Sequence, residues 1–256
     1  MRRISASVVM YGGAEEARRC LESLAEYTAA PGFVVYLVDN ASPDGALQQL
    51  KEAPLPACVQ LCPQEKNRGY GAGHNAVLPE LDSRYHAVVN PDIQLTEDSL
   101  SLLADWMDAH PDVAIATPRL LYPDGQPQYT AKRRPAVLPL LARQLRLKAL
   151  KRYEDHYLML DEDLARPQEI TFCSGSFFVI RTELYRQMGG FDEGYFMYVE
   201  DADITQKALQ YGRAMYWPGT AVIHTWHRDA HRKPRQFFWQ LRSMLRYFRK
   251  WGWRWK

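Results

Sequence analysis

The segment from Gly189 to Asp203, GGFDEGYFMYVEDAD, carries the densest chemistry in this 256-residue sequence. Its five carboxylates alternate with aromatic side chains directly before a predicted helix. Such crowding is costly unless the acids hold a cation, accept hydroxyl groups or act as a base. Aromatic faces stack on the C–H surface of a sugar while carboxylates bind its hydroxyls, so the pattern favours a saccharide site. The alternative is that Glu200, Asp201 and Asp203 only favour the helix N-terminus through its dipole.

A second polar motif, Asp39-Asn40, follows an apolar run at residues 33–38. In a doubly wound sheet, the carboxyl end of a buried strand is where a base or ribose is held, because a carboxylate there accepts hydrogen bonds from ring N–H or hydroxyl groups. The alternative is an Asx turn in which Asp39 caps the next helix.

A third motif, Asn90-Pro91-Asp92, follows the predicted strand 86–89. A carboxylate at such a strand end is suited to a divalent cation that bridges phosphates, although a plain turn has the same sequence signature. His224 follows the predicted strand 221–223, and a neutral imidazole there would complete an oxygen-rich metal site with Asp92. His227 and His231 are expected at the surface or in contact with phosphate.

The stretch from Asn67 to Asn75, NRGYGAGHN, places a glycine at every second position before a predicted helix. Backbone without a Cβ lets a ligand approach closely, and a helix N-terminus offers free N–H groups to an anion. The Gly-Lys-Ser/Thr of a phosphate loop does not follow. The alternative is a purely structural turn.

The first 120 residues alternate strand-like and helix-like stretches at a regular spacing. The expected strands are 4–10, 33–38, 57–61 and 86–89, and the expected helices are 14–27, 44–52, 74–81 and 97–109. This alternation predicts an open, doubly wound α/β sheet with its ligands at the carboxyl ends of the strands.

The second half adds elements to the same sheet. Residues 118–134 are rich in Pro, Gly and polar side chains and are expected to be irregular. The expected strands are 170–180, interrupted at 174–176, then 214–217 and 221–223, and the expected helices start at Thr182, Glu200 and Pro234. We predict one α/β domain over residues 1–230, followed by a basic helical segment over residues 231–256.

Composition narrows the class of protein. Apolar residues make up 46% and charged residues 24%, which excludes disordered, collagenous and coiled-coil chains. No apolar run is long enough to span a bilayer and the first residues do not resemble a secretory signal, so we expect a cytoplasmic protein. Its four cysteines lack disulfide or zinc spacing and are expected to be reduced packing residues: Cys20, Cys58, Cys62 and Cys173.

The charges are sorted along the chain. Residues 131–152 hold eight Lys/Arg and residues 232–256 hold nine, and neither block contains an acid. The remaining residues carry a net charge of −15, although the whole chain has only +2. Two clean basic blocks indicate an anionic partner surface.

The predicted helix 234–250 indicates which surface this is. An apolar series is flanked by cations one position later, with tryptophans at the end: Phe237, Leu241, Leu245 and Phe248, then Arg242, Arg246 and Arg249, then Trp251, Trp253 and Trp255. Residues 138–150 repeat this pattern with Leu141, Leu145 and Ala149 beside Arg146 and Lys148. Such helices lie on an anionic membrane leaflet, unless the apolar face packs on the core.

Nucleic-acid binding is the competing interpretation of the basic blocks. The segment 232–256 interleaves eight aromatics with its nine cations, a composition that suits stacking on single strands. The acids gathered at the predicted sheet edge would repel phosphates, so we expect no nucleic-acid partner.

Taken together and in this order, the motifs resemble those of the family 2 glycosyltransferases of the A-type (GT-A) fold. The resemblance covers roughly residues 4–228 through VVMY, LVDNAS, NRGYGAGHN, VNPDI, CSGSFFVIR, GGFDEGYFMYVEDADI and AVIHTWH. The wording of YGAGHN, NPDI, GYFMYVED and FWQLRSMLRYF is most similar to bacterial rhamnosyltransferases that build lipopolysaccharide and O-antigen chains. The resemblance implies a doubly wound mixed sheet flanked by helices, with a nucleotide-sugar half (1–120) and an acceptor and catalytic half (121–230).

The resemblance also assigns roles to residues. The base-binding acid falls on Asp39, the catalytic Glu-Asp pair on Glu200-Asp201 with Asp201 as the base, and the metal ligands on Asp92 and His224. Asn90 stands where many relatives have Asp, which removes one carboxylate from the divalent cation (Mg²⁺ or Mn²⁺). The nucleotide-sugar side comprises Met10, Tyr11, Gly12, Asp39, Asn40, Arg68, Gly69, Asn75 and Asn90, and the acceptor side comprises Gly175, Ser176, Tyr198 and Asp203.

The reaction implied by this resemblance is an inverting transfer. Asp201 removes the proton of an acceptor hydroxyl, which attacks the anomeric carbon as the nucleoside diphosphate leaves. The implied donor is dTDP-L-rhamnose and the implied acceptor is a lipid-linked or lipopolysaccharide saccharide at the inner face of the cytoplasmic membrane. UDP- or GDP-linked donors are the alternative, and a non-catalytic glycan-binding relative is a further one.

Overall fold

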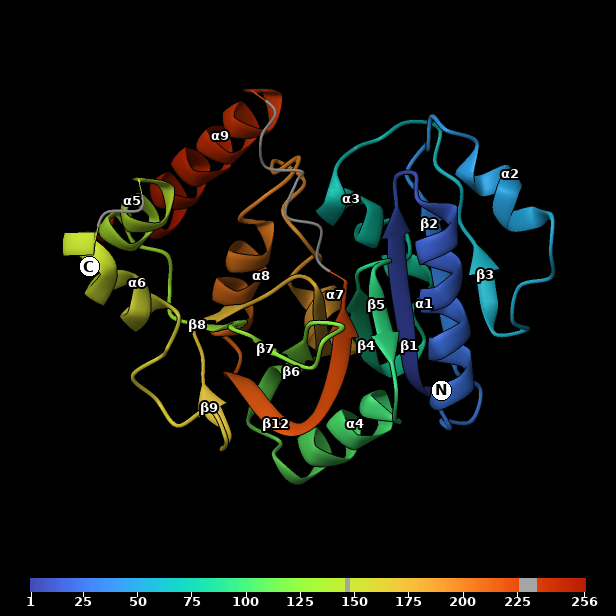
Figure 1. The fold of residues 1–256 in the computed structure, drawn as a ribbon. Helices are drawn as coiled ribbons and strands as arrows, with labels where there is room; N and C mark the ends of the chain where they lie inside the picture. Colours follow the sequence, from blue (N-terminus) through green and yellow to red (C-terminus); the bar gives the residue numbers. More distant parts are fainter. Residues whose placement is uncertain (146–147, 226–233) are drawn as a thin grey trace.

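A single mixed sheet organises the protein. The computed structural model describes residues 1–145, 148–225 and 234–256 (Figure 1). The strand order is β3-β2-β1-β4-β11-β6-β12-β5. These strands are β1 Arg2–Met10, β2 Val34–Asp39, β3 Val59–Leu61, β4 Ser83–Val89, β5 Ile93–Leu95, β6 Val113–Leu121, β11 Phe177–Arg181 and β12 Arg213–His224. The predicted doubly wound mixed sheet is therefore confirmed.

Strands β1 to β4 are parallel to one another, as their apolar runs predict, and β12 is parallel to β6. All six residues of β2 are buried, the pattern of a strand covered on both faces. Strand β11 is antiparallel to β4 and β6, so the second half of the chain joins the same sheet. The carboxyl ends of β1, β2 and β4 consequently lie along one edge.

Helices cover both faces. Helices α1 (Ala14–Tyr27) and α4 (Ser99–Ala109) pack on one face through a core that includes Ile4, Val8 and Leu37. The opposite face is covered by α3 (Tyr70–Asn75), α7 (Thr182–Gln187) and α8 (Glu200–Ala208). Strand residues alternate between the two cores, as a pleated sheet requires. The remaining short elements are α2 (Ala46–Lys51) and a 3₁₀ turn at Leu78–Glu80.

A chain of buried polar groups crosses the second face. Ser5 Oγ lies 2.8 Å from His86 Nδ1, and Ser7 Oγ lies 2.8 Å from His86 Nε2 and 2.7 Å from His74 Nδ1. All four side chains are fully buried. Burial lowers the pKa of both histidines, to about 3 for His86, so the two rings are neutral.

The sequence prediction missed the central strand β6. Pro118 lies within β6, and proline normally argues against a central strand because it cannot donate to the ladder. Opposite it, the β12 register shifts between Tyr216 and Ala221, which accommodates the missing donor. The predicted strands 214–217 and 221–223 are the two parts of β12 on either side of this irregularity.

The segment 118–134 is also more ordered than predicted. It contains β7 (Pro127–Gln128) and β8 (Ala131–Lys132), which pair with β6 and with β10 (Phe172–Cys173). Strand β9 (Gln168–Glu169) pairs with β12. The expected interruption at 174–176 is confirmed, because these residues separate β10 from β11. The four cysteines are free, and Cys20 and Cys173 are buried, as expected.

A third core lies at one end of the molecule. Helix α9 (Pro234–Trp251) packs there with α5 (Val137–Leu145) and α6 (Lys151–Tyr157), which a 3₁₀ turn at Lys148–Leu150 precedes (Figure 1). Its buried residues include Tyr157, Tyr195 and Phe248. None of the helices that the structure describes is long and apolar enough to cross a bilayer.

The predicted apolar stripe of α9 is corrected by this packing. Tyr247 and Phe248 are buried, whereas Phe237, Phe238 and Leu241 are 48%, 68% and 45% exposed. The helix therefore turns one face to the core at its C-terminal end and presents apolar side chains to solvent near its N-terminal end. The side chains of Leu145, Arg146 and Lys148, and all of His227 and His231, lie outside the described residues.

Candidate active site

The paired acids stand at the start of α8, on a strained turn. Tyr198 and Val199 have φ of 71° and 67°, a left-handed conformation that costs a β-branched residue such as Val199 of order 1–3 kcal/mol. This turn ends the loop of residues 189–199, hereafter the 189–199 loop. Strain of this kind persists where the surrounding structure fixes the chain, and here it sets where Glu200 and Asp201 project.

Asp201 is held by the interruption between β10 and β11. The N–H of Gly175 donates to Asp201 Oδ2 at 3.0 Å, and the N–H of Ala202 donates to Oδ1 at 3.0 Å. A Cβ on Gly175 would lie 3.1 Å from the Cβ of Asp201, so glycine permits this close approach. Tyr70 donates its hydroxyl proton to the carbonyl of Gly175 at 2.6 Å, which fixes the same segment from the other side.

The two acids differ in their charge state. Burial, and then repulsion from Asp201, raises the pKa of Glu200 to about 8. Burial also raises the pKa of Asp201, but Lys132 and the N–H groups of Gly175 and Ala202 oppose that rise. Lys132 and these N–H groups therefore favour the charged form of Asp201 over that of Glu200. Glu200 Oε2 is a buried oxygen with no hydrogen-bond partner among the described residues.

Asp92 and His224 meet where the ends of β4 and β12 come together, as predicted. Asp92 Oδ2 lies 3.4 Å from His224 Nε2, and the N–H of Thr225 donates to the carbonyl of Asp92 at 2.9 Å. Asn90, which precedes this pair, donates its N–H to the carbonyl of Ser176 at 2.8 Å. A direct hydrogen bond therefore joins the segment 90–92 to the β10–β11 turn that orients Asp201.

Gln128, which the sequence prediction missed, fixes the tautomer of His224. Its Nε2 donates to the carbonyl of His224 at 2.8 Å, so its Oε1 faces His224 Nδ1 at 2.7 Å and accepts the proton there. A neutral His224 then turns the lone pair of Nε2 toward the carboxylate of Asp92. Asp92 Oδ1 and His224 Nε2 are both buried without a hydrogen-bond partner in the described part of the chain.

Two acceptor atoms facing each other in this way fit a divalent cation. Imidazole and carboxylate are ordinary ligands of Mn²⁺ and Mg²⁺ sites, and Gln128 orients the imidazole as outer partners of metal ligands do. Within the ranges described above, no group of three or more His, Cys, Asp and Glu gathers around Asp92 and His224.

The nucleotide edge is built around the ends of β1 and β2. Asp39 is buried and its Oδ1 accepts the N–H of Ser42 at 3.1 Å, and the hydroxyl of Ser42 accepts the N–H of Gly12 at 2.8 Å. Tyr11 is 57% exposed beside them. These residues share one edge, as predicted, although the Asx-type turn at Asp39 is present too.

Several predicted nucleotide contacts serve the scaffold instead. The side chain of Met10 is fully buried in the core, which contradicts a ligand contact through that side chain. Asn40 Nδ2 donates to Asn67 Oδ1 and to the carbonyl of Gly69, both at 3.0 Å. Gly69 approaches the 189–199 loop so closely that a Cβ would lie 2.3 Å from the carbonyl oxygen of Phe196.

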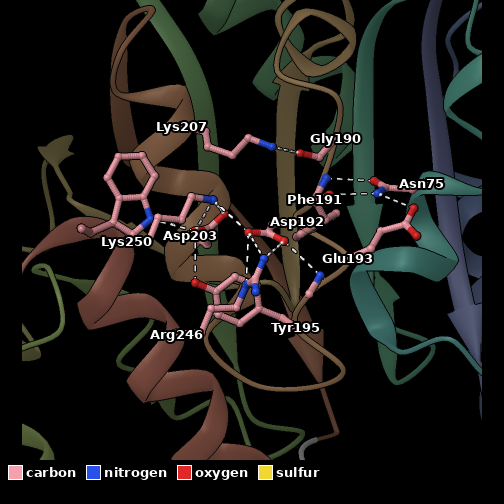
Figure 2. Close-up of polar contacts among 12 residues, drawn as sticks. Asn75, Gly190, Phe191, Asp192, Glu193, Tyr195, Asp203, Lys207, Arg246 and Lys250 are labelled. Atoms are coloured by element: carbon pink, nitrogen blue, oxygen red, sulfur yellow. Dashed lines mark hydrogen bonds and ion pairs between the residues drawn. The ribbon is translucent and has the colours of Figure 1, made fainter.

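The 189–199 loop also engages Arg68 and Asn75. Arg68 forms an ion pair with Glu193 at 2.5 Å. Asn75 Nδ2 donates to the carbonyl of Phe191 at 2.9 Å, and Asn75 Oδ1 accepts the N–H of Phe191 at 2.8 Å (Figure 2). Both residues therefore join α3 and its preceding loop to the acidic loop, and Asn75 has no amide atom directed at the nucleotide edge.

Asp203, predicted to bind substrate, lies in a structural cluster. Its carboxylate is fully buried and accepts from Lys250 at 2.8 Å, Trp251 Nε1 at 2.7 Å and Tyr195 at 3.2 Å (Figure 2). Because two of these three donors belong to α9, the carboxylate of Asp203 joins α9 to α8. The spacing of Glu200, Asp201 and Asp203 places them on one helix turn, but only the first two remain available.

Asp192 completes the attachment of α9. Arg246 NH2 donates to both of its carboxylate oxygens, at 2.8 and 3.0 Å, and Lys250 lies 3.1 Å away. Burial disfavours the charge of Asp192, yet Arg246, Lys250 and the N–H of Gly194 together lower its pKa to about 2. The basic residues at the end of α9 are thus partly paired with the acidic loop.

A cavity of about 250 Å³ opens beside the acid pair. Its lining includes Glu200, Asp201 and Tyr198, with Lys132 from β8. Lys132 Nζ lies 4.7 Å from the centre of the Phe172 ring. Lys132 was absent from the predicted site, because its block of cations reads only as a surface feature in the sequence.

The fold defines the class of protein. Solved structures that share it are glycosyltransferases of the GT-A type. GalNAc-T7 with UDP, GalNAc and Mn²⁺ has a TM-score of 0.69 at 15% identity and covers 98% of this chain and 48% of its own. S. aureus TarS 1-349 has a TM-score of 0.61 at 22% identity over 87% of this chain, which spans 60% of that chain. The mannosyltransferase PcManGT from Pyrobaculum calidifontis, in complex with GDP-Man and Mn²⁺, has a TM-score of 0.62 at 17% identity and covers 97% of this chain and 64% of its own.

The family follows from the sequence. The profile described as "Glycosyl transferase family 2" matches residues 5–189, and the chain belongs to this family. N-acetylglucosaminyl-diphospho-decaprenol L-rhamnosyltransferase of Mycobacterium tuberculosis is 30% identical over 237 residues, 84% of this chain and 74% of that protein. Rhamnosyltransferase WbbL of Escherichia coli K12 is 28% identical over 196 residues, 70% of each chain.

The raised pKa of Glu200 predicts the pH dependence of stability. The folded protein binds the Glu200 proton more tightly than the unfolded chain does. The contribution of Glu200 to the free energy of unfolding therefore decreases as pH rises from about 4.5 toward about 8. The free energy of unfolding of Glu200→Gln should therefore rise relative to wild type across that interval, by a few kcal/mol. Urea unfolding at several pH values measures this difference. Glu183→Gln, the same change on an exposed residue, should show none, and a constant Glu200→Gln difference would contradict the assignment.

Proposed function

We propose that the protein transfers L-rhamnose from dTDP-L-rhamnose to a hydroxyl of a lipid-linked saccharide, with inversion at the anomeric carbon. The observation that carries the proposal is a pair of hydrogen bonds at the β10–β11 turn. The N–H of Gly175 donates to Asp201, and the carbonyl of Ser176 accepts the N–H of Asn90, two residues before Asp92. In this proposal, Asp201 is the base and Asp92 belongs to the site of the donor diphosphate. The names of the bacterial relatives support rhamnose and a diphospho-lipid acceptor.

Asp201 acts as the base in this proposal. Its Oδ1 and Oδ2 each accept one backbone N–H, which orients the carboxylate and keeps lone pairs for the acceptor hydroxyl. Burial favours the protonated form of Glu200, which donates a hydrogen bond to the substrate through Oε2, the carboxyl oxygen without a partner among the described residues. Asp39 binds the base or ribose of the donor at the end of β2.

Asp92 and His224 hold a divalent cation in this proposal, with the remaining positions left to phosphate oxygens and water. The cation, when bound, offsets the negative charge that develops on the departing diphosphate. Gln128 keeps the proton on His224 Nδ1, so that Nε2 is the ligand atom. Asn90 donates its backbone N–H to Ser176 and positions Asp92 without adding a carboxylate.

The protein works at the inner face of the cytoplasmic membrane in this proposal. The two basic blocks and the exposed Phe237, Phe238 and Leu241 of α9 support it, because cations draw the chain to anionic lipid and apolar side chains enter the headgroup region. A lipid-linked acceptor resides on that surface. The acidic remainder of the chain argues against nucleic acid as the anionic partner.

Asp201→Asn should lower turnover by about 10²- to 10⁴-fold while donor binding persists, because the amide keeps the shape but accepts no proton. Rhamnose transfer and dTDP-L-rhamnose binding are measured in parallel, with UDP- and GDP-linked sugars as competing donors. Asp163→Asn, at an exposed position, is the matched control. Near-normal turnover would move the base to Glu200, and turnover with only a UDP or GDP sugar would overturn the donor assignment.

Asp92→Ala and His224→Ala should each weaken nucleotide binding in Mn²⁺ far more than in EDTA, since each removes a cation ligand. Titration calorimetry of dTDP under both conditions measures the difference. Asp124→Ala, the same change on an exposed turn, should leave both affinities unaltered. If EDTA leaves wild-type binding and rate unchanged, the cation assignment is wrong.

The protein should co-sediment with vesicles that contain anionic lipid at low salt and dissociate at high salt, since each interfacial cation contributes about 1 kcal/mol. The double variant Arg242→Glu/Arg249→Glu, at exposed positions on α9, should bind markedly less. Lys51→Glu/Arg166→Glu makes the same charge change at exposed positions elsewhere and should bind normally. Equal sedimentation with neutral and anionic vesicles would refute the proposed association with an anionic membrane surface.

A further inference from the structure

The cavity beside the acid pair is closed on one side by α9. Its lining from this helix is Gln240, Met244, Tyr247 and Phe248, and the opposite wall includes Glu200 and Asp201. Further apolar surface comes from Pro135, Leu140, Tyr157 and Phe172. One helix therefore supplies about a third of the lining, and it faces the two acids that carry the proposed chemistry.

Helix α9 lies outside the part of the chain that defines the family. The family profile ends at residue 189, whereas α9 begins at Pro234. The nucleotide edge at β1, β2 and β4 lies within the profile. In Figure 1, α9 lies on the far side of α8 from strands β1 and β2.

This wall is fixed in place by polar contacts to α8 and to the 189–199 loop. Asp203 accepts from Lys250 and Trp251, and Asp192 accepts from Arg246 (Figure 2). Ser243 donates its hydroxyl to the carbonyl of Met197 at 2.8 Å. The contacts lie on both sides of Met244 along the helix. Gln240 and Met244 therefore face the cavity from a fixed backbone, which is a requirement for selective recognition.

The chemistry of the lining fits a sugar ring. Tyr198, Tyr247 and Phe172 offer aromatic surface, Gln240 offers an amide, and Glu200 Oε2 is a buried oxygen without a hydrogen-bond partner in the described ranges. Aromatic faces cover the C–H surface of a pyranose, and carboxyl and amide groups bind its hydroxyls or an N-acetyl group. A bare acyl chain would leave the acids unmatched.

We propose that this cavity is the subsite for the acceptor sugar that bears the attacking hydroxyl, and that Gln240 and Met244 of α9 select that sugar. The proposal rests on the proposed function, because it uses Asp201 as the base. The strand ends, with Asp39, Asp92 and His224, then bind the donor, while the C-terminal helix determines the acceptor. The exposed Phe237, Phe238 and Leu241 lie on the same helix, on the approach from a membrane surface.

The test measures acceptor and donor recognition separately in Gln240→Ala and Met244→Ala. The probe acceptor is an N-acetylglucosaminyl-diphospho-lipid with a short, water-soluble isoprenoid, and the donor is dTDP-L-rhamnose. We expect the acceptor KM and the acceptor Kd to rise about tenfold, with donor KM and acceptor-independent donor hydrolysis within about twofold of wild type. Gln210→Ala, the same change on the exposed turn after α8, should match wild type. Thermal unfolding verifies that each variant is folded.

Each outcome bears on one proposal. If wild type transfers rhamnose and the acceptor KM of both variants is unchanged, the cavity assignment is wrong and the proposed function stands. A change in donor KM or donor hydrolysis instead would assign the cavity to the donor sugar and overturn the inference. If wild type binds the acceptor through Gln240 but transfers no rhamnose, the rhamnose donor is wrong and the subsite stands. Failure of wild type to bind the acceptor in calorimetry would reject the subsite for this class of acceptor.

Discussion

The active-site end of the molecule depends on one buried carboxylate, that of Asp203. It sits in the first turn of α8, two residues after Asp201, and accepts from Lys250 and Trp251 at the end of α9. Removal of Lys250 or Trp251 would deprive the buried carboxylate of Asp203 of its counter-charge or of a hydrogen-bond donor, which is strongly destabilising. The position of the acid pair and the position of α9 are therefore not independent. The cavity between them exists only in this arrangement.

The predictable part of the site is the part that strand ends dictate. Asp39, Asp92 and His224 each follow a strand whose apolar run is visible in the sequence, and the parallel order brings them to one edge. Gly175 was equally predictable, since the β10–β11 interruption is visible as Ser-Gly-Ser. These assignments need only the sheet and its direction.

The remaining part depends on tertiary contacts that leave no local signal. Gln128 lies in a short strand within a segment rich in turn residues, and its role requires β7 to meet the end of β12. Asp203 has the same helical context as Asp201, and only its contact with α9 distinguishes this structural acid from the proposed base. Pro118 argued against a strand at β6 because it cannot donate a backbone hydrogen bond. The register shift in β12 that accommodates the missing donor lies about 100 residues away in the sequence and leaves no local signal.

The buried hydrogen-bonded chain of Ser5, His86, Ser7 and His74 also links the proton positions of its four side chains. Each neutral imidazole carries one proton, and each hydroxyl donates once, so the direction of one hydrogen bond determines the direction of the next. If His86 donates from Nε2 to Ser7, then Ser7 donates to His74 Nδ1 and the proton of His74 resides on Nε2. If His86 donates from Nδ1 to Ser5, every bond reverses and His74 Nε2 becomes an acceptor. This buried chain thus has two proton arrangements, and the position of the proton on His74, whose ring contacts Tyr70 within α3, follows from the orientation of the His86 hydrogen bonds on β4.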